Sequence, residues 1–209
     1  MTSPSEPSGL WSTQAWREKA RRVLYSGVVD PAAHLLAGTG LTPNKVTLAG
    51  GALSVAAGLA VSRGYLFAGG VLVLASGALD LLDGALARVM GKKSKFGAVL
   101  DSTLDRVSEA SVLFGLLVLY TGIGSTPRVL LVYGTLVGSV LVSYIRARAE
   151  GEGVDCRVGV LTRSERTIIM ALGLLLGRVP PALLTLALLS YVTAGQRLLH
   201  VRRVAAEES

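Results

Sequence analysis

The sequence predicts an all-α integral membrane protein with about six transmembrane helices and an N-terminal amphipathic helix at the membrane interface. Hydrophobic residues make up 51% of the 209 residues, and the mean hydropathy is +0.54. The apolar residues form repeated stretches of about 20 residues, the length needed to cross a hydrocarbon core. Basic residues gather at the ends of these stretches, a placement that indicates membrane topology and anionic ligands instead of nucleic-acid binding.

Residues 1–40 are expected to form a polar leader and a juxtamembrane helix. Trp11 and Trp16 offer apolar contacts, while Arg17 and Arg21 offer positive charge. Such a segment is expected to lie on a bilayer and not to cross it. It has no apolar core region behind a basic start, so it does not resemble a cleavable signal peptide.

Six apolar stretches follow, and each is expected to form a transmembrane helix. They span residues 44–63, 65–90, 95–121, 127–149, 164–178 and 180–201. In one set of turns the only basic residues are Arg63, Arg128 and Arg178, and the other connections carry the remaining positive charge. By the positive-inside rule, both termini and the polar site are predicted to face the cytoplasm of a cell-membrane protein. Residues 41–203 would form the transmembrane domain and 204–209 a polar tail.

Four aspartates interrupt the second and third of these helices. Asp80 and Asp83 are three residues apart, and Asp101 and Asp105 are four apart, so each pair shares one face of its helix. A charge at the centre of a spanning helix costs roughly 2.5–3.5 kcal/mol, so four carboxylates require a compensating partner. Carboxylate oxygens favour hard cations such as Mg²⁺, Mn²⁺ or Ca²⁺. Because residues 89–96 suit a reversal between antiparallel helices, the two acidic faces are expected to converge on a metal ion.

Other interpretations of these acids explain less of the sequence than a metal site does. Simple ion pairing, for example of Asp105 with the next arginine, does not require four acids on two matched faces. It also leaves unexplained why the small residues Gly84 and Ala87 line the gap. A cation transporter with a buried acidic path or a membrane scaffold without catalysis would explain the carboxylates. Neither accounts for the fixed spacing between Arg88 and Gly97.

The acidic segment resembles the signature of the CDP-alcohol phosphatidyltransferase family. The matching residues, at the same spacing throughout, are Asp80, Asp83, Gly84, Ala87, Arg88, Gly97, Asp101 and Asp105. The resemblance implies a six-helix membrane enzyme, usually a homodimer, that transfers a phosphatidyl group from CDP-diacylglycerol to an alcohol and releases CMP. It also implies two Mg²⁺ or Mn²⁺ ions held by Asp80, Asp83, Asp101 and Asp105. Asp105 would be the general base, and the CDP-lipid would contact Asp80, Gly84, Ala87 and Arg88.

A second basic cluster lies downstream, and arginine forks suit phosphate oxygens. The sequences SYIRARAE and FGAVLDSTLDR resemble the phosphatidylinositol-phosphate synthase branch of the family, although Arg146 stands where that branch is expected to have lysine. The resemblance implies an inositol phosphate acceptor whose phosphate is bound by Ser143, Arg146, Arg148, Arg166 and Arg197. Glycerol 3-phosphate is the alternative acceptor. An archaeal-type ether lipid is an alternative donor, because no residue pattern in the sequence distinguishes the lipid tails.

Overall fold

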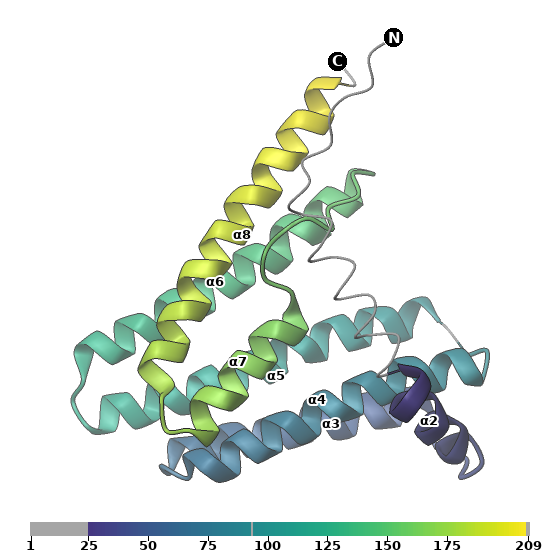
Figure 1. Cartoon of the computed structure of the whole chain (residues 1–209), viewed down its shortest axis with the longest axis horizontal. Helices are drawn as coiled ribbons and strands as arrows, with labels where there is room; N and C mark the ends of the chain where they lie inside the picture. The colour runs from purple at the N-terminus through teal and green to yellow at the C-terminus, as the bar shows by residue number, and fades with distance from the viewer. Residues whose placement is uncertain (1–24, 93, 208–209) are drawn as a thin grey trace.

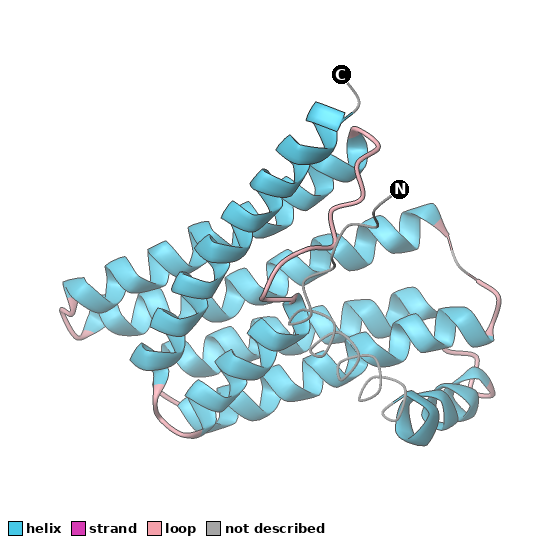
Figure 2. Ribbon diagram, turned by 45° about the horizontal axis from the view of Figure 1, so that its top comes forward, coloured by secondary structure: helices cyan, strands magenta, loops and turns pink. Residues whose placement is uncertain are grey.

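The computed structural model describes residues 25–92 and 94–207, and every regular element in these ranges is a helix (Figures 1 and 2). The predicted all-α class is therefore confirmed. Six helices follow one another in the expected places: α3 (Pro43–Ser62), α4 (Leu66–Val89), α5 (Lys95–Gly122), α6 (Thr126–Gly151), α7 (Arg163–Leu175) and α8 (Val179–Glu207). They are preceded by a π-helical turn, η1 (Tyr25–Val29), which continues into α2 (Asp30–Ala37).

Four helices, α3, α4, α6 and α8, are long and apolar enough to cross a membrane. α5 has 28 residues and carries an acidic pair, whereas α7 has only 13 residues. At 1.5 Å per residue α7 is about 20 Å long, which is shorter than a hydrocarbon core of about 30 Å. The chain thus has the helices of a membrane protein, and the number of crossings stays a prediction.

Three short turns lie together at one end of the bundle, on the left in Figure 1. They join α3 to α4, α5 to α6 and α7 to α8. Each contains a glycine with positive φ, namely Gly64 at 85°, Gly124 at 68° and Gly177 at 63°. Glycine adopts this left-handed conformation without steric cost, so these residues end the preceding helices and reverse the chain. The longer α4–α5 and α6–α7 connections lie at the opposite ends of their helices.

The juxtamembrane segment packs against the end of α4 that lies beside the α4–α5 connection. Val29, Ala33 and Ala85 are buried in this contact, while Val28 and Leu35 are exposed. Exposed apolar side chains on a short helix fit the predicted position at a bilayer interface. The expected contributions of Trp11, Trp16, Arg17 and Arg21 lie outside the described residues.

α3 lies directly against both α4 and α5, and two glycines allow the α3–α5 approach. A Cβ atom on Gly115 would overlap the backbone oxygen of Gly58, and one on Gly58 would overlap the backbone of Ser111. The main core continues across α7 and α8 through Leu174 and Leu183, both almost fully buried. This packing fixes α5 beside α3 and α4, with its acidic face toward α4.

Candidate active site

The predicted convergence of the two acidic faces is found in the structure. Asp80 of α4 and Asp101 and Asp105 of α5 each place a carboxylate oxygen within 4.8 Å of the others. Asp83 lies one turn after Asp80 and is 5% exposed. Its Oδ2 atom is buried without a hydrogen-bond partner among the described residues. Such an atom is costly to bury unless something else satisfies it.

The donor chemistry of this cluster fits a divalent metal ion. Four carboxylates supply oxygen ligands only, and Thr47, Asp80, Asp83 and Asp105 line one small cavity between α3, α4 and α5. A hard cation would compensate the clustered negative charge and would satisfy the buried oxygen of Asp83. The residues present therefore fit the metal that the motif implies.

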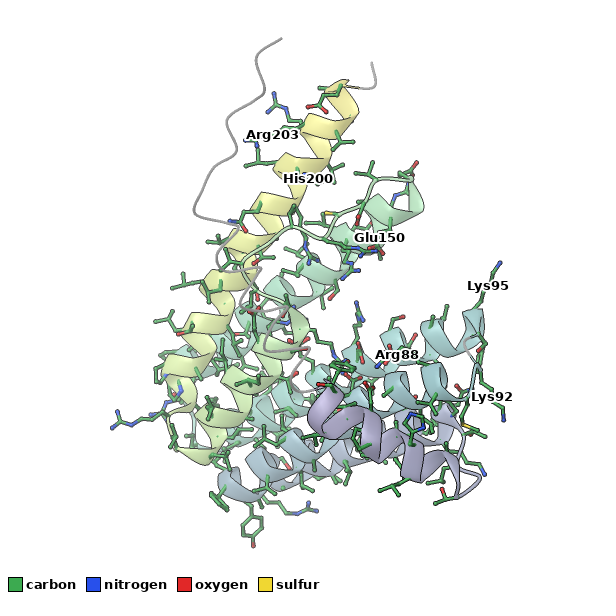
Figure 3. All side chains as sticks on the ribbon, turned by 45° about the vertical axis from the view of Figure 1, so that its right-hand side comes forward. Arg88, Lys92, Lys95, Glu150, His200 and Arg203 are labelled. Carbon is green, nitrogen blue, oxygen red and sulfur yellow. The ribbon has the colours of Figure 1, made fainter. Side chains whose placement is uncertain are left out.

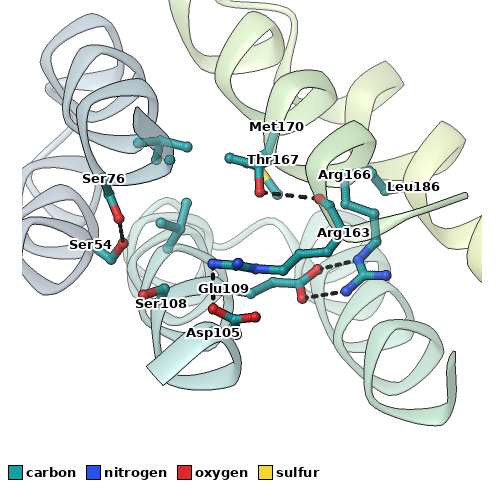
Figure 4. Close-up of a pocket in the computed structure, with 13 residues that line it drawn as sticks. Ser54, Ser76, Asp105, Ser108, Glu109, Arg163, Arg166, Thr167, Met170 and Leu186 are labelled. Atoms are coloured by element: carbon teal, nitrogen blue, oxygen red, sulfur yellow. Dashed lines mark hydrogen bonds and ion pairs between the residues drawn. The ribbon is translucent and has the colours of Figure 1, made fainter. Parts of the chain in front are cut away.

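Arg163 is the main site residue that the sequence analysis missed. Its Nη1 donates to Asp80 Oδ2 at 2.6 Å. Its Nη2 donates to Asp105 Oδ1, also at 2.6 Å (Figure 4). One guanidinium thus joins the acids of α4 to those of α5. A signal was available, because Arg163 and Arg166 are three residues apart at the start of a helix and so share a face.

The start of α7 is fixed by local hydrogen bonding. The Thr162 backbone N–H donates to Glu165 Oε2 at 2.6 Å, as in a capping box. This bond satisfies a backbone donor that has no partner within the helix. Helix α7 therefore begins at Arg163, so that the first turn of α7 points toward the acidic cluster of Asp80, Asp101 and Asp105.

Arg166 lies one turn further along α7 and pairs with a residue of α5. Its Nε and Nη2 donate to the two carboxylate oxygens of Glu109 at 2.9 and 3.1 Å (Figure 4). Arg166 is 6% exposed, so this is a buried bidentate pair. Glu109 was also missed, although it continues the four-residue spacing of Asp101 and Asp105.

A pocket of about 520 Å³, counted with its open mouth, lies beside these residues. One wall is acidic and comes from α5, with Asp105, Ser108 and Glu109, and the facing wall is basic and comes from α7, with Arg163 and Arg166. Figure 4 shows Ser54 and Ser76 on the far side, joined by a 2.7 Å hydrogen bond. The remaining lining includes the apolar side chains of Met170 and Leu186. The pocket thus combines a few charged and hydroxyl groups with a largely apolar lining.

The residues expected to contact the CDP-lipid continue along α4 from the acids. Gly84 leaves open space, because a Cβ atom there would meet only the Arg88 guanidinium at 3.9 Å. Ala87 is half-buried, and Arg88 is exposed. The Arg88 guanidinium lies 4.9 Å from the centre of the Tyr25 ring and 3.9 Å from the Asp30 carboxylate. The juxtamembrane segment thus contacts Arg88 one to two helical turns beyond Asp83.

The expected acceptor-phosphate residues are spread over three helices. Ser143, Arg146 and Arg148 lie on α6, and the two arginines are exposed and pair with Glu150 and Glu152 at 2.8 and 2.5 Å. Figure 3 shows Glu150 near the C-terminal end of α6.

Arg197 of α8 is buried and lies close enough to Arg146 and Arg166 for their positive charges to interact. The structure therefore places Arg166 in the same pocket as Asp105, with Arg197 within interaction range of Arg146 and Arg166.

The known proteins that this chain resembles belong to the same family that the acidic motif indicates. The profile of the CDP-alcohol phosphatidyltransferase family matches residues 40–198. The phosphatidylinositol phosphate synthase of Mycobacteroides abscessus is 38% identical over 190 residues, which cover 87% of this chain and 86% of that protein. The archaetidylinositol phosphate synthase of Pyrococcus horikoshii is 39% identical over 169 residues, covering 80% and 87%.

Two solved structures of Mycobacterium tuberculosis phosphatidylinositol phosphate synthase resemble this fold at 38% identity. The structure with CDP-DAG bound has a TM-score of 0.77 and covers 83% of this chain and 93% of that one. The structure in complex with manganese and citrate has a TM-score of 0.75 and covers 83% and 88%.

Proposed function

Because the chain belongs to the CDP-alcohol phosphatidyltransferase family and is a phospholipid synthase of the membrane, we propose that its acceptor is inositol phosphate. The observation that carries the proposal is the pocket whose basic wall, Arg163 and Arg166, faces Asp105. A phosphorylated polyol offers both a phosphate for the arginines and a hydroxyl for the aspartate. The bacterial and archaeal relatives differ in the lipid part of their names and share inositol phosphate.

Asp105 is proposed to act as the general base. Its carboxylate removes the proton from an acceptor hydroxyl while that oxygen attacks the phosphorus bonded to diacylglycerol. The bond from this phosphorus to the bridging oxygen breaks, and CMP leaves with that oxygen. Arg163 holds the Asp105 side chain in place through its 2.6 Å contact.

We propose Mg²⁺ or Mn²⁺, in two ions, as the metal, with Asp80, Asp83, Asp101 and Asp105 as the ligands. A bound divalent ion neutralises charge on the pyrophosphate and on the departing CMP. Asp80, Gly84, Ala87 and Arg88 are proposed to contact the CDP part of the donor. The open space at Gly84 and the exposed Arg88 guanidinium support this assignment.

The acceptor phosphate is proposed to bind among Ser143, Arg146, Arg148, Arg166 and Arg197. Arg197 lies near Arg146 and Arg166. Arg146 and Arg166 pair with Glu150 and Glu109 in this structure, and a bound phosphate would offer these guanidinium groups a further partner. The acidic wall at Ser108 and Glu109 would then accept hydrogen bonds from acceptor hydroxyls.

The proposed cellular setting is the cell membrane, with both termini and the active site on the cytoplasmic side and the protein as a homodimer. The charge pattern supports the orientation, because Arg63, Arg128 and Arg178 are the basic residues at the three short turns. The other ends of the helices carry more positive charge, including Lys92 and Lys95 in Figure 3.

The direct test is an acceptor panel with purified protein, CDP-diacylglycerol and Mg²⁺ or Mn²⁺. Inositol phosphate, glycerol 3-phosphate, inositol and serine are compared by CMP release and by product mass. We expect turnover with inositol phosphate and a product of the mass of phosphatidylinositol phosphate. A matched donor with ether-linked tails tests the lipid preference. Turnover restricted to glycerol 3-phosphate would overturn the proposed acceptor.

A further inference from the structure

The segment that connects α6 to α7, residues 154–162, is not helical and lies along α8 (Figures 1 and 2). Four α8 side chains bond its backbone. His200 Nε2 lies 3.0 Å from Asp155 O, and Arg197 Nε donates to Val158 O at 3.0 Å. The Val160 N–H donates to Gln196 Oε1 at 3.1 Å. The Leu161 N–H donates to Thr193 Oγ1, also at 3.1 Å. Positions 193, 196, 197 and 200 are spaced i, i+3, i+4 and i+7, so they form one face of α8. We call this set the α8 clamp.

The connecting segment is also tightly packed against α8. Gly159 has a φ of +133°, and a Cβ atom there would overlap Thr193 Cγ2. Cys156 and Leu161 are buried, at 0% and 3% exposure. The segment therefore has one well-defined position against α8, set by side-chain packing as well as by hydrogen bonds.

The length of α7 explains why this segment needs such support. Helix α7 ends at the same end of the bundle as the other short turns and is only about 20 Å long. In the predicted six-span topology, its first residue, Arg163, would therefore lie within the thickness of a hydrocarbon core of about 30 Å. Irregular backbone at that depth persists only where protein or water satisfies its polar groups.

Arg197 connects this segment to a third element. While its Nε bonds Val158 O of the segment, its Nη1 donates to Val142 O of α6 at 2.6 Å. The guanidinium is thus held between two backbone carbonyls. These contacts of Arg197 hold the connecting segment in place between α6 and α8.

We propose that the α8 clamp positions the acceptor site, with Thr193, Gln196 and Arg197 as positioning residues. By fixing Val158 to Leu161, the clamp sets the place of Arg163 and Arg166, which follow Leu161 by two and five residues. Arg197 supports the connecting segment through its bonds to Val158 O and Val142 O, in addition to its proposed place in the acceptor-phosphate site. This inference rests on the proposed function, because it assigns the two α7 arginines to the acceptor.

The test compares Thr193→Val with Thr193→Ser. Valine removes the oxygen that accepts the Leu161 N–H at nearly constant volume, whereas serine keeps it. We expect Thr193→Val to raise KM for the acceptor about fivefold or more, with KM for CDP-diacylglycerol within about twofold of wild type. Thr193→Ser should restore most of the acceptor affinity. Thr185→Val is the matched control, because Thr185 is exposed and its hydroxyl bonds Pro181 O within the same helix.

A second measurement does not depend on the acceptor. Hydrogen exchange at the Val160 and Leu161 amides should be slow in the wild type and at least about tenfold faster in Thr193→Val. Gln196→Met, which removes the partner of Val160, provides the same readout if Thr193→Val does not fold. Equal changes in both KM values, or unchanged amide exchange, would overturn the positioning role. Failure of the proposed acceptor would instead appear in the wild-type panel, and KM would then be measured with the acceptor found there.

Discussion

At the scale of single residues, Asp105 has the contacts expected of a positioned base. Its Oδ1 accepts from Arg163 at 2.6 Å, and its Oδ2 lies 3.6 Å from Arg106. The side chain is 12% exposed and shares the acidic cluster with Asp80 and Asp101. A carboxylate fixed by a guanidinium on one oxygen can take a proton on the other.

Replacing Asp105 by asparagine should abolish most turnover while keeping the fold. Asparagine has the same shape but cannot take the proton, and general-base effects are on the order of 10²–10⁴-fold. The measurement is the rate of CMP release at saturating substrates. Asp155→Asn is the control, because that carboxylate is 71% exposed and lies in the α6–α7 connection. Wild-type turnover in Asp105→Asn would remove it from the base role.

The four aspartates could be placed from the sequence more readily than Arg163. Helical periodicity alone puts Asp80 with Asp83, and Asp101 with Asp105, on shared faces. The start of α7 at Arg163 has a local signal in the capping box of Thr162 and Glu165, but the distance of Arg163 from the acids depends on contacts between the connecting segment and α8. Those contacts join residues more than 30 positions apart and follow no local period.

At the scale of helices, α3 and α5 cross where Gly58 and Gly115 meet. Their backbones are in contact because neither residue has a side chain. Small residues at such crossings let membrane helices approach closely and gain packing energy. This crossing determines how far α5 lies from α3 and α4, and thereby the separation of the acids.

Gly58→Ala should destabilise the protein. The added methyl group would overlap the Ser111 backbone, and overpacking of this kind costs about 1–3 kcal/mol. We expect a clearly lower Tm in detergent and reduced turnover. Gly134→Ala on α6 is the matched control, since a Cβ atom there has no neighbour within 4 Å and alanine is the better helix former. Similar Tm values for the two variants would contradict the packing argument.

Helix boundaries agreed with the sequence where a glycine turn follows an apolar run, as at Gly64 and Gly124. The agreement was poorer for α7, predicted over 164–178 and found over Arg163–Leu175, and for α8, which continues to Glu207 past the predicted end at 201. The apolar signal fades at the end of α8 while helix-forming residues continue. Hydropathy therefore locates the apolar part of a helix better than its termini.

At the scale of the whole molecule, metal binding should stabilise the fold. Four carboxylates on two helices repel one another, and a cation bound only by the native state adds about 2.7 kcal/mol at a hundredfold excess over Kd. Mn²⁺ or Mg²⁺ should therefore raise Tm, and a chelator should reverse the rise. The increase should be much smaller for Asp101→Asn and unchanged for Asp155→Asn. An equal rise in both variants would place the ion elsewhere.

The proposed orientation can be tested by labelling single cysteines in intact cells with a membrane-impermeant maleimide. Arg63→Cys and Arg178→Cys should react from outside, whereas Lys92→Cys and Arg157→Cys should react only after the membrane is permeabilised. Background should be low, because burial raises the pKa of the Cys156 thiol and so keeps it protonated and unreactive. The reverse labelling pattern would invert the topology.

The acids of α5 lie well inside the helix, since Asp105 follows the first residue, Lys95, by ten positions, or about 15 Å. The reacting phosphorus of a bilayer-embedded donor can meet them without its acyl chains leaving the lipid. The lipid donor then reaches the site by two-dimensional diffusion within a leaflet, whereas the acceptor reaches it by three-dimensional diffusion from bulk solution. Diluting the donor with inert lipid or detergent at constant total amount should therefore slow the reaction, as in surface-dilution kinetics.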